Sequence, residues 1–192
     1  MRQIDLSRLL RSAALAMATL LSACGGGGGT GVVPAFRVQS GVVVADFNAD
    51  GRDDVAVATT TIAGPPPHPG YVQVYLQTAG GSFDVPVQYA IGPDPWGMSA
   101  GDADGDGRLD LVVATPSTVA AQANAIGDSG GVSILRQDRT QPGRFLASQW
   151  IATGGMAEDA AMADLNGDGR ADLIVADGVG LNGRALGGDF EL

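Results

Sequence analysis

The stretches DFNADGRDD at residues 46–54, DADGDGRLD at 102–110 and DLNGDGRAD at 164–172 are three copies of one nine-residue pattern. In each copy Asp or Asn stands at the first, third and fifth places, Gly at the sixth and Asp at the ninth. A hard cation such as Ca²⁺ takes about six to eight oxygen ligands, which alternate residues of a curled loop can supply. Glycine at the sixth place adopts positive φ without steric cost and allows the sharp turn. The pattern therefore predicts three cation-binding loops.

The residues after each loop indicate which kind of loop it is. Short β-branched runs follow, namely VAVAT at 55–59, LVVAT at 111–115 and LIVAD at 173–177. A helix–loop–helix calcium site would place Glu at the twelfth position, where this chain has Val57, Val113 and Val175. Each loop is therefore expected to close a β-hairpin. Asp-Gly and Asn-Gly also form good hairpin turns without metal, but three copies with identical spacing favour a metal site.

The composition suits closely packed strands and tight turns better than long helices. The chain has 192 residues, of which 30 are glycine and 5% are aromatic, so the core must consist of small aliphatic side chains. The net charge is −10 and no lysine is present. Nucleic-acid binding requires a basic face that neutralises phosphates, so we expect no nucleic-acid partner.

Residues 1–23 have the features of an export signal. Three arginines precede the apolar run SAALAMATLL at 12–21, which is too short to span a bilayer comfortably. The run ends in LSAC at 21–24, which resembles the lipobox of bacterial lipoproteins and implies lipidation of Cys24. An ordinary secretory signal that happens to meet a Cys, or a single membrane anchor, remains the alternative.

A Gly-rich linker at residues 24–34 follows the signal and cannot pack against a core. The chain has a single Cys, which leaves no partner for an intramolecular disulfide and fits an anchoring role. Several acyl chains would hold the protein stably on a membrane. By resemblance to lipoproteins, Gly25 after the Cys implies the outer membrane in a Gram-negative envelope.

The spacing of the loops indicates repeated units. The first and second copies start 56 residues apart, and the second and third start 62 residues apart. The segment YVQVYLQ at 71–77 alternates apolar and polar residues as a strand does. We place unit openings at GSF (81–83) and GRF (143–145), which aligns Tyr89 with Trp150. A period near 60 with about four strands per unit is a propeller-blade signature.

These units resemble FG-GAP/VCBS repeats, the blade type of the integrin α-subunit propeller and of many bacterial surface proteins. The resemblance covers roughly residues 35–176. It implies an all-β fold, a partial β-propeller of about three blades within residues 35–192, with about three Ca²⁺ ions on its hairpin loops. The implied ligands are the side chains of each loop and one Arg carbonyl: Asp46, Asn48, Asp50, Arg52 and Asp54; Asp102, Asp104, Asp106, Arg108 and Asp110; Asp164, Asn166, Asp168, Arg170 and Asp172. We expect the guanidinium groups of these arginines to point to solvent.

The chain is too short to close a propeller ring alone, because closed rings take about four to eight blades. Residues 35–192 suffice for two to three blades at this period. An open arc exposes strand edges and apolar faces. The sequence therefore indicates either a truncated relative of a longer protein, which we favour, or copies that self-associate through open blade edges.

The preferred functional interpretation is a calcium-binding, membrane-anchored extracytoplasmic lipoprotein that serves as a binding, adhesion or scaffolding module for a protein or glycan ligand. The alternative is a fragment or accessory domain of a carbohydrate-active enzyme. The sequence supports no Ser-His-Asp or Cys-His arrangement, because its only His, His68, lies in a proline-rich loop where we expect solvent exposure. We therefore expect no enzymatic activity. Trp96 and Trp150 are interpreted as buried between blades, with stacking on a sugar as the alternative.

Overall fold

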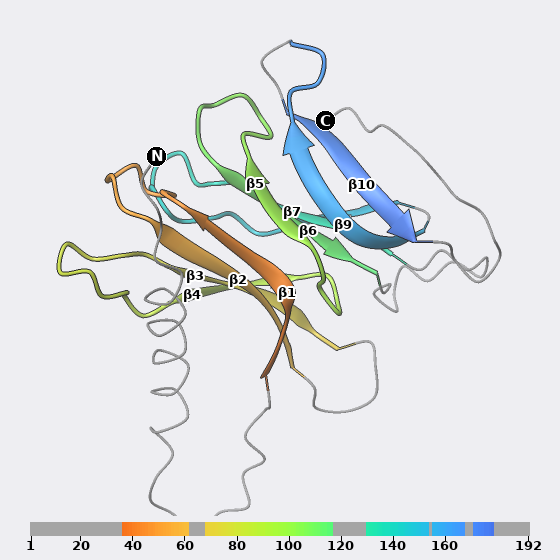
Figure 1. Ribbon diagram of the computed structural model, residues 1–192, viewed down its shortest axis with the longest axis horizontal. Coiled ribbons are helices and arrows are strands. Elements are labelled where there is room, and N and C mark those ends of the chain that lie inside the picture. The colour runs from red at the N-terminus through yellow and green to blue at the C-terminus, as the bar shows by residue number, and fades with distance from the viewer. Residues whose placement is uncertain (1–35, 62–67, 117–129, 154, 168–170, 179–192) are drawn as a thin grey trace, which may run out of the picture.

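The computed structural model describes residues 36–61, 68–116, 130–153, 155–167 and 171–178, with the backbone alone for 36–40 (Figure 1). Within these ranges the regular elements are all β-strands, which confirms the expected all-β class. The described residues include no helix long and apolar enough to cross a membrane. The expected signal peptide, Cys24 and the Gly-rich linker lie outside the described residues.

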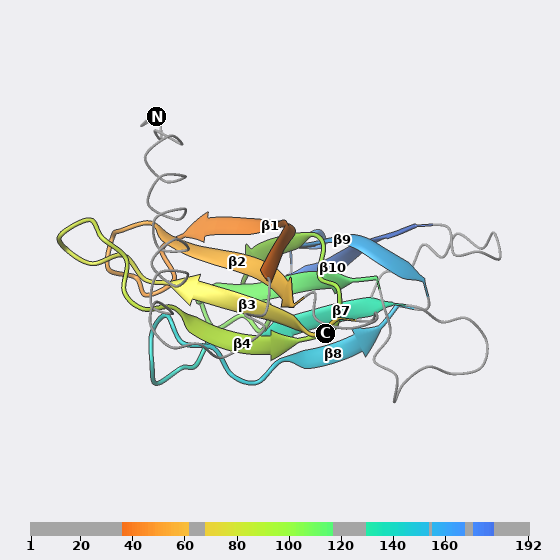
Figure 2. The same cartoon turned by 90° about the horizontal axis from the view of Figure 1, so that it is seen from below.

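The strands form two four-stranded antiparallel sheets and one two-stranded hairpin. The first sheet contains, in spatial order, β1 (Phe36–Ala45), β2 (Asp54–Thr61), β3 (Gly70–Tyr75) and β4 (Val87–Ile91). The second contains β5 (Met98–Gly101), β6 (Asp110–Thr115), β7 (Gly131–Leu135) and β8 (Gln149–Ala152). The hairpin pairs β9 (Met156–Ala163) with β10 (Asp172–Gly178). In Figure 2 the strands β1 to β4 follow one another in chain order, as in a propeller blade.

Each acidic loop joins the first two strands of one unit, so the predicted hairpins β1–β2, β5–β6 and β9–β10 are confirmed. The runs after the loops lie in β2, β6 and β10 as expected. Two complete blades and the start of a third agree with a partial β-propeller.

The unit boundaries inferred from the sequence are wrong. The segment after GSF forms β4, which pairs with β3 at the outer edge of the first sheet, and the segment after GRF forms β8 in the second. Val72 pairs with Tyr89, and Val132 pairs with Ile151. Tyr89 therefore corresponds to Ile151, and the sequence alignment with Trp150 was one residue out of register. A one-residue shift moves a side chain to the opposite face of a strand.

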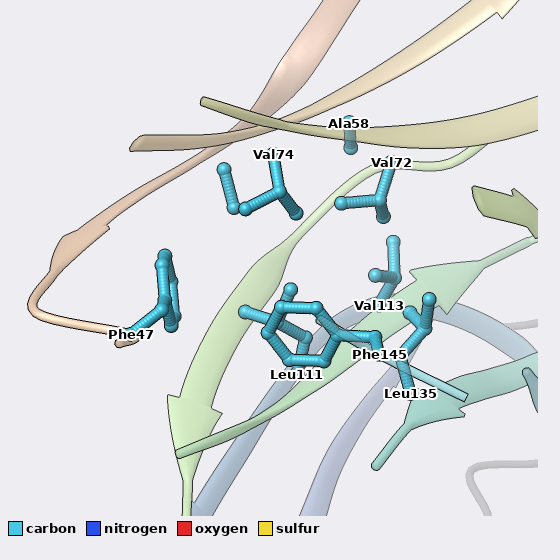
Figure 3. Close-up of a cluster of buried hydrophobic side chains, with 9 residues drawn as sticks. Phe47, Ala58, Val72, Val74, Leu111, Val113, Leu135 and Phe145 are labelled. Atoms are coloured by element: carbon cyan, nitrogen blue, oxygen red, sulfur yellow. The ribbon is translucent and has the colours of Figure 1, made fainter. Parts of the chain in front are cut away.

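A first hydrophobic core lies between the two sheets (Figure 3). Ala56, Ala58, Val72 and Val74 of the first sheet meet Leu111, Val113 and Leu135 of the second, and Phe47 and Phe145 close the cluster at the acidic-loop end. The alternation in β3 follows from this arrangement, because the apolar face of the strand is the one that packs against the second sheet.

A second core lies between the second sheet and the β9–β10 hairpin. Val112, Ala114, Val132 and Ile134 pack there against Ala157, Ala160, Met162 and Leu173. Every residue of β6 and β7 is buried, because the second sheet is covered on both faces. This explains why LVVAT and GVSIL read as continuous apolar runs and YVQVY does not. The layers approach closely: a Cβ on Gly101 would lie 2.8 Å from the Cβ of Met162.

Candidate metal centre

The second acidic loop brings its first three carboxylates together. Asp102 accepts the N–H of Asp106 at Oδ1 (3.0 Å) and the N–H of Gly107 at Oδ2 (2.7 Å), which curls the loop around its carboxylate. Asp106 Oδ1 accepts the N–H of Arg108 at 3.0 Å. One oxygen from each of Asp102, Asp104 and Asp106 lies within 4.8 Å of the others. The structure thus gathers the oxygens at the first, third and fifth places, as the spacing predicts.

The first acidic loop has the same geometry. Asp46 accepts the N–H of Asp50 at 3.0 Å and that of Gly51 at 2.7 Å, the same i+4 and i+5 pattern as Asp102. Asn48 Oδ1 also accepts the Asp50 N–H, at 3.1 Å, so the Asp46 and Asn48 oxygens point to one place. Two loops of different sequence therefore share one backbone course.

That course requires left-handed backbone at two places. The sixth place is confirmed, with φ of 83° at Gly51 and 82° at Gly107. The fourth place was not singled out from the sequence, and it also has positive φ: 72° at Gly105, 78° at Gly167 and 58° at Ala49. An alanine in this region is strained by roughly 1 kcal/mol or more, so the first loop forms in spite of its fourth residue.

The Asp at the ninth place ties each loop to the sheet. Asp54 and Asp110 are 0% and 1% exposed. Asp54 accepts the N–H groups of Phe47 (3.0 Å) and Gln77 (2.7 Å). Asp110 accepts the equivalent N–H groups of Ala103 (2.9 Å) and Gln137 (2.7 Å).

The bonds of Asp54 and Asp110 join the second residue of each loop to the residues just beyond β3 or β7. Asp172 makes the first of these two bonds, to the N–H of Leu165 at 2.9 Å. A carboxylate has about four lone-pair directions, so the predicted role of these residues as calcium ligands stays a prediction beside the structural role.

The buried carboxylates are ionised at a cost. Burial raises the pKa of Asp110 to about 6, although the backbone N–H donors of Gln137 and Ala103 lower it, and Asp104 and Asp106 raise it further by charge repulsion. Burial likewise raises the pKa of Asp54. A nearby divalent cation would oppose this effect, because it favours the charged form of a carboxylate.

The expectation that the seventh-place arginines point to solvent is wrong for Arg52 and Arg108, whereas Arg170 lies outside the described residues. Arg52 Nε donates to the carbonyl oxygen of Gln77 at 2.9 Å, and its Nη2 pairs with Asp50. Arg108 Nη1 donates to the carbonyl oxygen of Asp138 at 3.2 Å. Each side chain therefore ties its loop to the connection that follows β3 or β7. The proposed ligand role of the arginine carbonyl groups stays a prediction.

Arg139, which the loop pattern did not indicate, contacts the second loop from the β7–β8 connection. Arg139 Nε donates to Asp106 Oδ2 at 2.9 Å, and Nη2 donates to Asp104 Oδ2 at 3.1 Å. Its partners lie 33 and 35 residues away in sequence, and no local pattern indicates them.

The residue at the second place shows how each loop meets the next blade. Phe47 is 2% exposed and packs edge-on against Phe145, with ring centroids 5.7 Å apart. Ala103 is buried against the β9–β10 hairpin. Leu165 is 66% exposed. The apolar character of this place is explained by the neighbouring blade, which covers the first two loops.

The third loop is described only in part. Asp164 Oδ1 accepts the N–H of Gly167 at 2.7 Å. Asp168, Gly169 and Arg170 lie outside the described residues, so the expected third ligand set stays a prediction.

The ligand atoms that the second loop offers fit a hard divalent cation such as Ca²⁺. They are all oxygens, the ligand type that calcium prefers. Asp104 Oδ1 is buried and has no hydrogen-bond partner in the part of the chain that the structure describes. Such an orphaned acceptor is costly unless a water or an ion binds it. Asp102, Asp104 and Asp106 would hold the ion, which would neutralise the charge of the loop.

The other residues singled out from the sequence have different surroundings. Trp150 lies in β8, the fourth strand of its sheet, where its Nε1 donates to Thr115 Oγ1 at 3.2 Å. Trp96 is 37% exposed, so the expectation that it is buried between blades is wrong. His68 is half-buried, and its Nδ1 lies 3.0 Å from Asp94 Oδ1. The expectation of an isolated, exposed His68 was therefore wrong, because its partner is 26 residues away.

Comparisons with known proteins agree with this architecture. The family described as FG-GAP-like repeat matches residues 46–113 and 119–175, and FG-GAP repeat matches residues 95–135. "Integrin alpha pat-2" of Caenorhabditis elegans is 30% identical over 157 residues, which cover 70% of this chain and 13% of that protein. "Phosphatidylinositol-glycan-specific phospholipase D" of Mus musculus is 36% identical over 93 residues, which cover 45% of this chain and 11% of that protein. The chain thus spans little more than a tenth of the length of these relatives.

Proposed function

The chain belongs to the FG-GAP repeat family, and from this premise we propose that it is a calcium-stabilised binding, adhesion or scaffolding module anchored to a bacterial cell envelope by a lipid on Cys24. The observation that carries the calcium part is the convergence of the Asp102, Asp104 and Asp106 oxygens within 4.8 Å. The matching hydrogen bonds in the first loop extend the proposal to a second ion.

Calcium would stabilise the fold by relieving charge repulsion. Each loop concentrates carboxylates that repel one another when the hairpin forms. With a Kd of about 0.1 mM, as is common in extracellular modules, about 1 mM calcium would contribute roughly 1.4 kcal/mol per site. A few such sites amount to a large fraction of the stability of an ordinary domain.

A chelation experiment tests this role. Thermal unfolding of the full-length protein is followed by circular dichroism in about 1 mM calcium and after exhaustive chelation. We expect a lower Tm without calcium, restored by calcium and not by the same ionic strength of a monovalent salt. The variant D102N should show a smaller calcium effect, whereas D84N, outside the loops, should match the wild type. An identical Tm with and without calcium would contradict the proposal.

The anchor is proposed from the sequence of residues 12–24. The variant Cys24→Ala should lose incorporation of radiolabelled palmitate and should no longer fractionate with membranes. Gly25 supports sorting to the outer membrane in a Gram-negative cell. Full-length protein recovered from cytosol with its first residues uncleaved would rule out both the anchor and the extracytoplasmic location.

A non-catalytic role is supported by the similarity to integrin alpha chains over 70% of this chain. The competing proposal is an accessory domain of a carbohydrate-active enzyme, and the similarity to a phospholipase D shows that related repeats occur in a protein named as an enzyme. Glu158 and Asp159 are exposed carboxylates on β9, outside the loops. Hydrolysis of a glycan by the purified protein that is abolished in E158Q or D159N would favour the enzyme, and binding to a glycan or protein array without turnover would favour the module.

Self-association through the open blade faces is proposed from the exposed apolar residues there. Val42 and Val44 of β1 are 53% and 41% exposed, and Ile174 of β10 is 42% exposed. Sedimentation velocity should show concentration-dependent dimers, which V44D should dissociate. A monomer at all concentrations would exclude this contact.

A further inference from the structure

The candidate ligands of the two described loops differ by one charge. At the third place the first loop has Asn48 and the second has Asp104. Their first, fifth and ninth places are Asp in both. The second loop therefore carries one more negative charge among its candidate ligands than the first.

The two loops also differ in what the neighbouring connection supplies. Gln77 and Gln137 are equivalent, because each donates its backbone N–H to the ninth-place Asp at 2.7 Å. Two residues further along, the first connection has Ala79 and the second has Arg139. The additional carboxylate and the additional guanidinium thus occur in the same blade, and they contact each other at 3.1 Å.

We propose that Arg139 is a built-in counter-ion of the second loop, paired with the additional carboxylate of Asp104. Its positive charge offsets part of the repulsion that a bound cation would otherwise relieve. The second loop consequently stays folded at low calcium and binds calcium more weakly than it would without the arginine. This inference deepens the proposed function and rests on the loops binding calcium.

The contact geometry indicates that the guanidinium acts through its charge and leaves the ligand position accessible. Arg139 bonds to the Oδ2 atoms of Asp104 and Asp106, and its side chain is 66% exposed. Asp104 Oδ1 is the buried atom without a hydrogen-bond partner among the described residues. The arginine therefore occupies the outer side of the cluster, and the inner oxygen remains for a cation.

The expected effect of the Arg139 charge on calcium affinity is moderate, because the side chain lies at the surface. Coulomb interactions between exposed charges are weakened by water and by salt, with a Debye length of about 8 Å at physiological ionic strength. We therefore expect loss of the arginine charge to raise the calcium affinity of the second loop by about 3- to 10-fold, and the gain to shrink at high salt.

Two variants test the inference in the full-length protein, R139Q and the matched control R144Q. Arg144 is exposed in the same connection, and its side chain has no hydrogen bond or ion pair with a residue that the structure describes. Calcium titrations followed by ¹H–¹⁵N correlation spectra report each loop separately. The Gly107 amide reports the second loop and the Gly51 amide reports the first, because each donates to the first-place Asp at 2.7 Å.

We expect R139Q to lower the Tm in calcium-free buffer more than R144Q does, because the acidic loop loses its counter-ion. In the titration, R139Q should bind calcium about 3- to 10-fold more tightly at Gly107 and unchanged at Gly51. The gain should largely disappear at about 0.5 M potassium chloride. The double variant D104N/R139Q gives the second loop the same candidate-ligand charges as the first and removes the extra guanidinium, so it should recover the calcium-free Tm that R139Q alone loses.

Two results would overturn the inference. One is a weaker or unchanged calcium affinity at Gly107 in R139Q, and the other is a calcium-free Tm that falls equally in R139Q and R144Q. A wild-type protein in which neither amide responds to millimolar calcium would contradict the proposed function, and with it this inference. The response of the Gly51 amide separates the two failures, since it does not depend on Arg139.

Discussion

Replacement of Asp54 by alanine should destabilise the protein strongly even without calcium. The side chain of Asp54 is fully buried, and it accepts the backbone N–H groups of Phe47 at 3.0 Å and Gln77 at 2.7 Å. Alanine would leave both donors buried without an acceptor. The cost of an unsatisfied buried donor is about 1–3 kcal/mol, so D54A should lose about 2–6 kcal/mol.

The adjacent Asp53 provides a matched control. It is exposed, and D53A removes the same charge from the same loop without removing either backbone bond. Exposed substitutions of this kind change stability by about 0.5 kcal/mol or less. The difference between the two variants therefore isolates the hydrogen bonds of Asp54 from the general electrostatics of the loop.

Equilibrium urea unfolding, followed by tryptophan fluorescence in calcium-free buffer, measures this difference. The Tm should fall in parallel by about 2–4 °C for each kcal/mol lost. The m-value should be unchanged, since the surface exposed on unfolding is the same. Equal urea midpoints for D54A and D53A would refute the argument that the ninth-place carboxylate ties the loop to the sheet.

Three further outcomes are expected. Ala49→Gly should stabilise the protein by about 1 kcal/mol in urea unfolding, because the φ of 58° is strained for alanine and Gly105 occupies the equivalent place; a lower midpoint would contradict this. Phe47→Ala should cost about 3–5 kcal/mol, whereas the exposed Leu165→Ala should cost less than about 0.5 kcal/mol, and similar losses would show that burial of the second place is unimportant. In calcium-free buffer the Tm should fall as the pH rises from about 4 to above 6. The pKa of Asp110 is raised from 3.8 to about 6 in the folded state, so folding favours the protonated carboxyl, and that form is lost over this pH window. D110N should flatten that dependence, and an unchanged slope would contradict the assignment.

The repeated loops are the part of the structure that the sequence predicted best. The first, third and fifth places converge in the second loop, the sixth place has positive φ in both described copies, and each loop closes a hairpin. These features depend on contacts within nine residues, which a local pattern specifies. The Gly at the fourth place belongs to the same local signal, and the comparison of Ala49 with Gly105 and Gly167 could have revealed it.

The features that the sequence analysis missed depend on distant parts of the chain. The blade boundary was wrong because pairing of β4 with β3 decides it, and both sides of that boundary read as strands. Arg52 and Arg108 bond to the protein because the carbonyl oxygens of Gln77 and Asp138 lie within reach. His68 contacts Asp94 because the β2–β3 connection lies beside the β4–β5 connection.

The sequence by itself determined the curled acidic loops, the hairpins that they close and the small aliphatic character of the core, because glycine conformation and strand alternation act over a few residues. Only the tertiary structure decided which face of each sheet is covered, which Asp serves as a buried acceptor for backbone groups just beyond β3 and β7, and that Arg139 contacts the second loop. Those outcomes depend on layers of sheet that pack against one another, and the contacting residues are brought together only when the blades assemble.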